Sequence, residues 1–428
     1  ACYNYAMAAL LAKPYVPGKA RGVLHRGYEP VSTDSILLLD QLALTQLAWR
    51  PAGILVVDGA TFSHAMIRLL TLGIPTVLIS SEVADCLVEG EEILIDGLNG
   101  TVVKQPGAEQ EAASHPVSAA ADDSIKLTDG SQALLRASLF HTADAELAVK
   151  SGASAIGLVR TEFILPEDGH QPDAVFYENA LGGLCDIAQP LPVTLRLPDI
   201  APDKQMPWLN MPADTCRPLA MQGVRLYHEE TVRDMVMSLL FAVNRLAAEY
   251  EINLLVPYVS DINEFSHWRG VIEQQLDASI PIGAMIESPA AVLAMPHWFD
   301  IADFVAIGCN DLMQCLFAAD RDLPEVSQYL DPYSPELFRF LQQASVAAGD
   351  NIDKVQLCGL LPQLTGVLPV LLGMGFRVFS IAPVMVPYQA KVVRETDMAQ
   401  AKNIARQVCE ARDSTQVKSL LLSSTPET

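Results

Sequence analysis

The stretch IPIGAMIESPAAVLAMPHWFDIADFVAIGCND, residues 280–311, contains one strand-and-helix unit and the strand that opens the next. Its first apolar run ends at Glu287, a helical stretch follows, and the second apolar run ends at Asn310 and Asp311. Near-continuous apolar strands separated by helices are typical of parallel sheets that are buried on both faces. This stretch therefore predicts neighbouring parallel strands with polar groups at their carboxyl ends.

The same pattern recurs through the C-terminal part of the chain. Eight apolar segments are candidate strands: 133–139, 155–164, 192–200, 252–260, 280–288, 303–311, 354–359 and 377–382. Eight strand–helix units close into a (β/α)8 TIM barrel, whose reactive groups lie at the carboxyl ends of the strands. The polar residues at these ends are Arg160, Glu162, Arg196, Asp199, Glu287, Asn310, Asp311 and Cys358.

A smaller α/β region precedes the barrel. Its candidate strands are 35–40, 52–58, 74–79 and 92–97, and TFSHAMIRLLTLG predicts a helix that ends at Gly73 with Leu69, Leu70 and Leu72 facing inward. Residues 106–124 are rich in Ala, Ser, Pro and acidic residues, which is typical of a linker. We therefore predict a small domain over 1–105, a linker over 106–124 and the barrel over 125–428.

Composition narrows the possible partners and the compartment. The 428 residues carry a net charge of -23, which argues against general binding to nucleic acid or to anionic membranes. No apolar run reaches the roughly 18 residues of a membrane-spanning helix, so we expect no membrane insertion. The eight cysteines are scattered without a C-x-x-C pair, which favours reduced thiols in a cytoplasmic protein.

The strand ends suggest metal and anion chemistry. Glu287 and Asp311 are suited to hold one Mg2+, which takes few carboxylates and completes its shell with water and substrate oxygens. The guanidinium groups of Arg160, Arg196 and Arg321 suit phosphate and carboxylate oxygens, so we expect a small phosphorylated carboxylic acid as ligand. Salt bridges at the barrel rim are the alternative reading of these charges.

Two further residues have a reactive and a structural reading. The Cys358 thiol is a candidate general acid, although a buried Cys is more often a small apolar side chain. His64 stands directly before an apolar helical pattern, so it is either a reactive imidazole or a helix-start residue. The residues near His64 do not decide between these readings.

Six stretches in one order resemble a known family: AIGLVRTEFIL, RLPDIAPDK, IPIGAMIESPAAV, DFVAIGCNDLMQCLFAADR, YLDPYSPELFRFL and LLGMGFRVFSIAP. They are similar to the phosphoenolpyruvate/pyruvate barrel of enzyme I of the bacterial sugar phosphotransferase system. Phosphoenolpyruvate synthase and pyruvate phosphate dikinase are more distant kin. The region around His64, with GIPTVLIS behind it, resembles the phosphohistidine domain of the same family.

The resemblance implies a role for each matching residue. His64 would take the phosphoryl group of phosphoenolpyruvate (PEP) and pass it on, with release of pyruvate. Arg160 and Arg321 would bind the phosphate, Asn310 would orient PEP, and Glu287 and Asp311 would hold Mg2+. Cys358 would protonate the methylene carbon of enolpyruvate. Arg196 and Lys204 are further candidates for substrate binding.

Several positions depart from the family pattern. GATFSH replaces GGRTSH, so Ala60, Thr61 and Phe62 stand where Gly, Arg and Thr are expected. Gln222 replaces a phosphate-binding Arg, and Leu360 replaces a carboxylate. A neutral donor forfeits the charge-assisted part of a hydrogen bond, so the loss of one arginine predicts transfer slowed by a factor on the order of ten.

The stretch HRGYEPVSTDS, residues 25–35, crosses in a few residues the place where enzyme I carries the helical module that docks its phosphocarrier protein. We expect PEP-dependent phosphotransfer to a phosphocarrier-type acceptor protein, by a homodimer formed through the barrel. The alternative is an enzyme I relative that binds PEP or pyruvate for regulation with little turnover. A remote third reading is an aldolase-like or lyase-like metal barrel, in which His64 would be idle.

Overall fold

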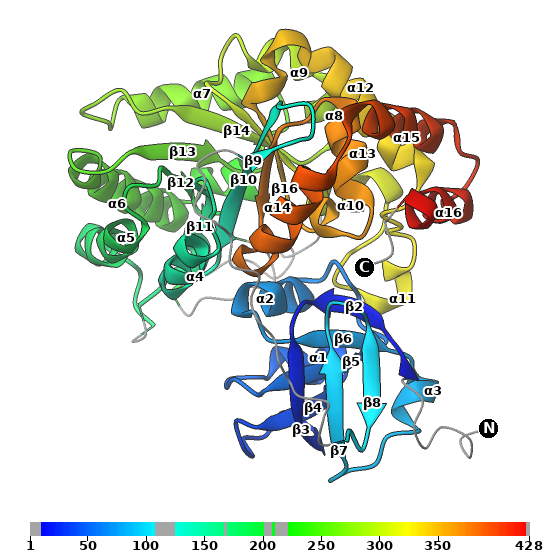
Figure 1. The fold of residues 1–428 in the computed structure, drawn as a ribbon. Helices are drawn as coiled ribbons and strands as arrows, with labels where there is room; N and C mark the ends of the chain where they lie inside the picture. Colours follow the sequence, from blue (N-terminus) through cyan, green and yellow to red (C-terminus); the bar gives the residue numbers. More distant parts are fainter. Residues whose placement is uncertain (1–9, 108–124, 167–168, 201–207, 210–220, 425–428) are drawn as a thin grey trace. The chain divides into compact units, whose positions relative to one another are not determined.

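The computed structural model describes residues 10–107, 125–166, 169–200, 208–209 and 221–424 (Figure 1). The chain divides into two compact units. Ala1–Ser118 and Arg321–Gln328 form the first, and Ala119–Asp320 and Tyr329–Thr428 form the second. Most of the expected linker, residues 108–124, lies outside the described residues.

The first unit is built on an eight-stranded mixed sheet in the order β1-β8-β7-β3-β4-β5-β6-β2. Adjacent strands from β3 to β6 are parallel, and the other pairs are antiparallel. The strands are β1 (Leu10–Leu11), β2 (Lys13–Val16), β3 (Lys19–Arg26), β4 (Ser35–Leu39), β5 (Gly53–Val57), β6 (Thr76–Ile79), β7 (Glu92–Asp96) and β8 (Thr101–Lys104). The helices are α1 (Gln41–Thr45), α2 (His64–Leu72) and α3 (Ser81–Ala84).

The four predicted strands of this unit are confirmed as β4, β5, β6 and β7. The sequence pattern missed β1, β2, β3 and β8. Three of these are short, and β3 mixes charged and apolar residues, KARGVLHR, with an irregular burial pattern. The chain passes from β3 to its parallel neighbour β4 through residues 27–34 alone, which confirms that no helical module is inserted there.

Helix α2 begins and ends where the local sequence predicts. Ser63 is the N-cap, and its side chain accepts a hydrogen bond from the Met66 N–H over 3.3 Å. Gly73 ends the helix in the left-handed conformation, with a φ of 61°. Leu69 and Leu70 are buried as expected, whereas Leu72 is only half-buried because the inward face runs through Met66 and Ile67. This frame places His64 at the first position of the helix.

The second unit is an eight-stranded parallel barrel, in which β10 pairs with both β11 and β17 and so closes the ring. Its strands confirm all eight predicted segments: β10 (Gln132–Leu139), β11 (Ile156–Arg160), β12 (Val193–Arg196), β13 (Ile252–Val256), β14 (Ile282–Ile286), β15 (Val305–Gly308), β16 (Val355–Cys358) and β17 (Val378–Ile381). The short strand β9 (Ile125–Lys126) pairs antiparallel with β10.

Helices surround the barrel strands (Figure 1). They are α4 (Ala145–Lys150), α5 (Ala174–Ala188), α6 (Glu230–Leu246), α7 (Ile262–Glu273), α8 (Pro289–Leu293), α9 (Met295–Trp298), α10 (Cys309–Phe317), α12 (Pro335–Ala348), α13 (Val367–Met374), α14 (Val386–Glu395), α15 (Met398–Glu410) and α16 (Ser414–Ser424). The further helix α11 (Pro324–Ser327) lies in the segment that belongs to the first unit. Among the described residues, no helix combines the length and the apolar character needed to cross a bilayer.

Side chains fill the barrel interior in layers. Leu158, Leu255, Met285, Ala306 and Cys358 form one buried cluster. Beside it, Gly157 leaves room for polar side chains, because an added Cβ would lie 2.6 Å from Arg136 Cβ and 2.7 Å from Ser380 Oγ. The barrel is therefore a packed core, and ligand chemistry belongs to the rim at the carboxyl ends of its strands.

Candidate active site

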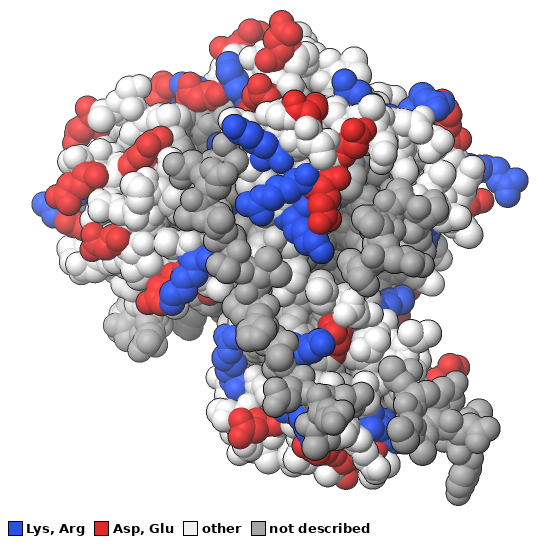
Figure 2. Space-filling view, viewed as in Figure 1, with Lys and Arg blue, Asp and Glu red and all other residues white. Residues whose placement is uncertain are grey.

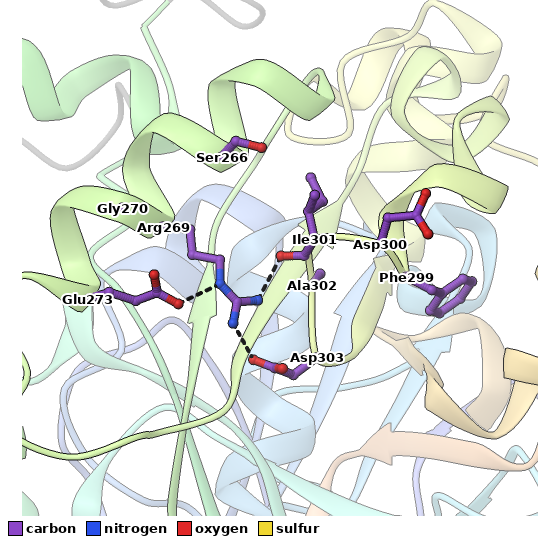
Figure 3. Close-up of a pocket in the computed structure, with 9 residues that line it drawn as sticks. All are labelled: Ser266, Arg269, Gly270, Glu273, Phe299, Asp300, Ile301, Ala302 and Asp303. Carbon is purple, nitrogen blue, oxygen red and sulfur yellow. Dashed lines mark hydrogen bonds and ion pairs between the residues drawn. The ribbon is translucent and has the colours of Figure 1, made fainter.

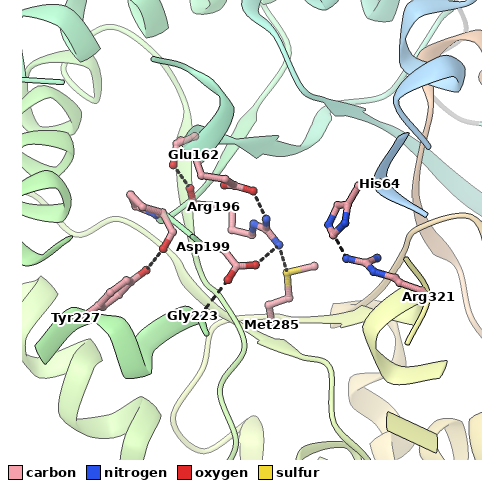
Figure 4. Close-up of polar contacts among 10 residues, drawn as sticks. His64, Glu162, Arg196, Asp199, Gly223, Tyr227, Met285 and Arg321 are labelled. Atoms are coloured by element: carbon pink, nitrogen blue, oxygen red, sulfur yellow. Dashed lines mark hydrogen bonds and ion pairs between the residues drawn. The ribbon is translucent and has the colours of Figure 1, made fainter. Parts of the chain in front are cut away.

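His64 is held through its backbone and both ring nitrogens within the first unit. Asp322 belongs to the segment Arg321–Gln328, which clusters with this unit. Its Oδ1 accepts the His64 backbone N–H over 3.0 Å, and its Oδ2 lies 2.9 Å from His64 Nδ1. On the other edge of the ring, Arg321 Nη2 lies 2.7 Å from His64 Nε2 (Figure 4).

These contacts define the tautomer of His64. A guanidinium group has only donors, so Nε2 must accept from Arg321 and carry no proton. The ring proton then sits on Nδ1 and is donated to Asp322. Burial acts to raise the pKa of the Asp322 carboxyl, but its hydrogen bonds and charge interaction with His64, together with the charge of Arg321, outweigh burial and lower the pKa to about 2. Nε2 is thus the nucleophilic nitrogen, with an ionised carboxylate behind the ring.

Neighbouring groups fix this arrangement. Gln41 donates from Nε2 to the Asp322 carbonyl over 3.3 Å and accepts the Ala60 N–H at Oε1 over 2.8 Å. Phe62, a departure from the family pattern, is only 4 % exposed, so its side chain is buried. The local sequence gives no signal for Asp322, which lies 258 residues from His64 in the chain.

In the barrel, Arg196 ends β12 within a buried network of charges (Figure 4). It hydrogen-bonds Glu162, lies 3.0 Å from Asp199 Oδ2, and contacts Met285 Sδ at 3.7 Å. Burial alone would lower the pKa of Arg196, but the carboxylates around it raise that pKa above its usual value. Arg196 is therefore a permanent positive charge at the barrel rim.

Asp199 connects this network to the chain that leads into α6. Its Oδ1 accepts the Gly223 N–H over 3.1 Å, and Gly223 packs so closely on the chain after β13 that an added Cβ would lie 2.5 Å from Tyr258 Cβ. This anchoring places Gln222 in the connection after the third barrel strand, as predicted. The Gln222 Oε1 atom is buried and has no hydrogen-bond partner among the described residues.

The two predicted metal ligands lie after neighbouring strands. Glu287 follows β14 and is 2 % exposed, and Asp311 lies in the first turn of α10, directly after β15. Burial and the hydrogen bond with Cys315 raise the pKa of Tyr258, and the charges of Asp311 and Glu287 add to the effect. Among the described residues, no group of three or more His, Cys, Asp or Glu side chains is arranged so that it could hold a metal ion. Two carboxylates fit Mg2+, which keeps several water or substrate ligands.

Asn310 lies in the first turn of α10 and contacts the segment that follows Cys358 at the end of β16. Asn310 Oδ1 accepts the Leu360 N–H over 3.1 Å, and an added Cβ on Gly359 would lie 2.7 Å from the same oxygen. Cys358 is 1 % exposed. Burial, partly offset by a hydrogen bond from Gln356, raises the pKa of its thiol to about 11. The thiol is therefore protonated at neutral pH, as a proton donor must be.

The remaining candidates are distributed differently. Arg160 ends β11, with its guanidinium 4.2 Å from the centre of the Phe140 ring. Arg321 belongs to the segment that contacts His64. Lys204 lies outside the described residues. The barrel rim thus gathers Arg160, Arg196, Glu287, Asn310, Asp311 and Cys358.

A hollow at the opposite, amino end of the barrel strands has a structural explanation (Figure 3). Its centre is Arg269 of α7, which bonds Glu273 at 2.8 Å, the Ile301 carbonyl at 2.7 Å and Asp303 at 3.1 Å. The dashed lines in Figure 3 join Arg269 to these three partners, so a network of ion pairs and hydrogen bonds occupies the hollow. On the face in Figure 2, basic side chains likewise lie beside acidic ones.

Gly308 is a sensitive test of the Glu287 geometry, because an added Cβ would lie 2.2 Å from Glu287 Oε1. We expect Gly308→Ala to displace this carboxylate and to weaken Mg2+ binding about 10- to 100-fold, the range seen when the support of a metal ligand is lost. Isothermal titration with Mg2+ measures the change. Gly270→Ala is the matched control, because a Cβ there meets nothing within 4 Å. Equal Mg2+ affinity in both variants would refute the assignment of Glu287 as a Mg2+ ligand.

Known proteins match both units. Residues 117–398 match the PEP-binding domain of PEP-utilising enzymes, and residues 33–100 match the mobile domain of the same enzymes. The chain therefore belongs to the PEP-utilising enzyme family and is enzyme I-like, as the sequence motifs predict. Its mixed-sheet unit is the mobile domain, and its barrel is the PEP-binding domain.

Three curated relatives illustrate the range of similarity. A phosphoenolpyruvate-protein phosphotransferase of Haloferax volcanii is 30% identical over 87% of this chain and 68% of its own length. A multiphosphoryl transfer protein of Escherichia coli is 31% identical over 65% of this chain. A phosphoenolpyruvate-dependent phosphotransferase system protein of Escherichia coli is 28% identical over 90% of this chain and 54% of its own length. The chain spans only 35% of the multiphosphoryl transfer protein.

Proposed function

We propose that this protein transfers the phosphoryl group of PEP to His64 Nε2, releases pyruvate, and passes the phosphoryl group on to an acceptor protein. The observation that carries the proposal is the state of the His64 ring. Its Nε2 has a lone pair facing a guanidinium, and its Nδ1–H faces an ionised carboxylate. A ring held in this way is prepared to act as a nucleophile toward an anionic phosphoryl group.

In the first step, Nε2 attacks the phosphorus atom of PEP, the N–P bond forms and the P–O bond to the enol oxygen breaks. The imidazole gains positive charge as this bond forms, and the Asp322 carboxylate stabilises that charge through the Nδ1–H bond. Arg321 moves from Nε2 to the phosphoryl oxygens. The positive end of the α2 helix dipole lies at the same place and favours the added negative charge.

In the second step, the enolate of pyruvate takes a proton at its methylene carbon. The Cys358 S–H bond breaks, a C–H bond forms from the electron pair of the enolate double bond, and the sulfur keeps its own electron pair as a thiolate. Solvent then reprotonates the thiolate. Arg160 and Arg196 bind the anionic oxygens of the substrate, and Asn310, fixed by the Leu360 N–H, orients it.

Glu287 and Asp311 are the residues suited to hold Mg2+ at this rim. When bound, the ion would neutralise substrate oxygens and support their orientation. The acceptor is proposed to be a small phosphocarrier-type protein. Assembly of the chain as a homodimer through the barrel and a cytoplasmic location also belong to this proposal.

Incubation with labelled PEP and Mg2+, followed by peptide mapping of acid-labile label, tests the transfer directly. We expect one labelled peptide, which contains His64, together with release of pyruvate. Binding of PEP without any label would instead favour the regulatory alternative. Two observations give that alternative its basis: the neutral side chain of Gln222, and the buried Leu360 where the family has a carboxylate.

Restoring the family arginine at Gln222 should raise PEP affinity or the rate of His64 labelling by about tenfold, because a charged donor strengthens a hydrogen bond to phosphate. Titration of PEP with Mg2+ present measures the effect in Gln222→Arg. Gln274→Arg adds the same charge at an exposed position at the end of α7 and is the control. A neutral or harmful result would mean that another cation, such as Arg225, already serves the phosphate.

A further inference from the structure

We propose that Gln356 is a positioning residue for the Cys358 thiol, and that Arg136 fixes its amide for this task. The inference rests on the proposed role of Cys358 as proton donor. Neither Gln356 nor Arg136 is a proposed metal ligand. Both lie deeper in the barrel than the rim residues proposed to bind the substrate. Gln356 and Cys358 stand two residues apart on β16, so both side chains point into the barrel.

Contacts around Gln356 determine which way its amide faces. Arg136 Nη1 lies 3.0 Å from Gln356 Oε1, and arginine can only donate, so the amide oxygen must face Arg136. The amide nitrogen then faces the other side. There it lies 3.0 Å from the Gly157 carbonyl and 3.1 Å from Cys358 Sγ. One N–H therefore goes to the carbonyl, and the other is donated to the sulfur.

A donor at the sulfur has two consequences for proton transfer. It occupies one lone pair of Sγ, so the S–H bond points away from Gln356. The apolar part of the surroundings of Cys358 is formed by Leu158, Leu255, Met285 and Ala306. The donor also remains in place when the proton leaves, and so stabilises the thiolate that forms. Gln356 is only 2 % exposed, which keeps water from replacing its N–H.

The side chains of Arg136, Gln356 and Ser380 form a polar layer in the barrel at the level of Gly157. Gly157 has no side chain where Arg136 and Ser380 pass, and an added Cβ would lie 3.1 Å from Gln356 Oε1. Ser380 Oγ lies 2.8 Å from Ser138 Oγ in the same layer. A half-buried arginine and a buried amide cost free energy in a barrel core unless they are satisfied. The contact of the Gln356 amide with the reactive sulfur, and that of Arg136 with the same amide, give both residues a reason to be here.

Exchange of the pyruvate methyl protons in D2O, followed by NMR with Mg2+ present, tests the proposal without any acceptor protein. We expect Cys358→Ala to lose the exchange. We expect Gln356→Leu to lower its maximal rate about five- to tenfold, the effect of one lost hydrogen bond, with an unchanged KM for pyruvate. Gln356→Glu keeps the partner of Arg136 but removes the N–H, so it should be at least as slow.

Gln389→Leu is the matched control, because this buried glutamine donates to the Gln363 carbonyl and has no contact with Cys358. Its exchange rate should equal that of the wild type. If Cys358→Ala stops the exchange but both Gln356 variants keep the wild-type rate, the positioning role is wrong while the proposed function stands. If Cys358→Ala exchanges like the wild type, the donor assignment fails and the positioning role fails with it. A raised KM together with the lowered rate would show a general structural effect and would also overturn the proposal.

Discussion

His64→Ala should reduce the acid-labile label from PEP to background, which is the largest effect that we expect. The variant lacks the nitrogen that forms the N–P bond, and no other ring nitrogen is held between Asp322 and Arg321. Exchange of pyruvate methyl protons should continue, because the residues proposed for it belong to the barrel unit. Radiolabelling and NMR exchange on the same preparation measure both quantities.

His25→Ala is the control for the loss of an imidazole in the same unit, since His25 pairs with Glu89 and not with Asp322. Asp322→Asn adds a graded test: the amide keeps the shape of the side chain but not its charge. Labelling should then slow without being abolished. Equal labelling of His64→Ala and the wild type would end the carrier assignment.

Glu287→Gln should weaken Mg2+-dependent binding of oxalate or PEP about 100-fold or more. The substitution keeps the volume of the side chain but removes one of two carboxylates suited to the ion, and even supporting groups of metal ligands are worth 10- to 100-fold. Binding measured without Mg2+ should change little. Isothermal titration of oxalate with and without Mg2+ separates the two contributions.

Glu273→Gln is the matched control, because Glu273 pairs with Arg269 at the amino end of the barrel strands. Its oxalate affinity should equal that of the wild type under both conditions. Metal-independent binding that is unchanged in Glu287→Gln would mean that Glu287 and Asp311 are rim ion pairs, and the Mg2+ assignment would have to be withdrawn.

Much of the barrel can be predicted because its signal is local. Each parallel strand is buried on both faces, so a short apolar run such as 282–286 is sufficient to mark it. The polar residue that follows each run then marks the rim. The edge strands β1 and β2 of the mobile domain were not predicted, because a strand of two to four residues shows too little periodicity to be recognised in the sequence.

Some features of the candidate sites could likewise be predicted from the sequence, and others could not. Motif order along the chain identified His64, Glu287, Asp311 and Cys358 as candidates, and it revealed the departures at Gln222 and Leu360. It could not show that Phe62 is buried, because the direction of a side chain in an irregular turn depends on what packs around it.

The sequence by itself determined the family, the two domains, the eight barrel strands and the start of α2. Only the tertiary structure brought Asp322 to His64 across 258 residues, and Arg136 to Gln356 across 220 residues. These partners have no local pattern, since their positions follow from the closing of a sheet and the path of a loop. The physical reason is that a hydrogen bond depends on distance and direction in space, whereas periodicity records only which face of its own element a residue occupies.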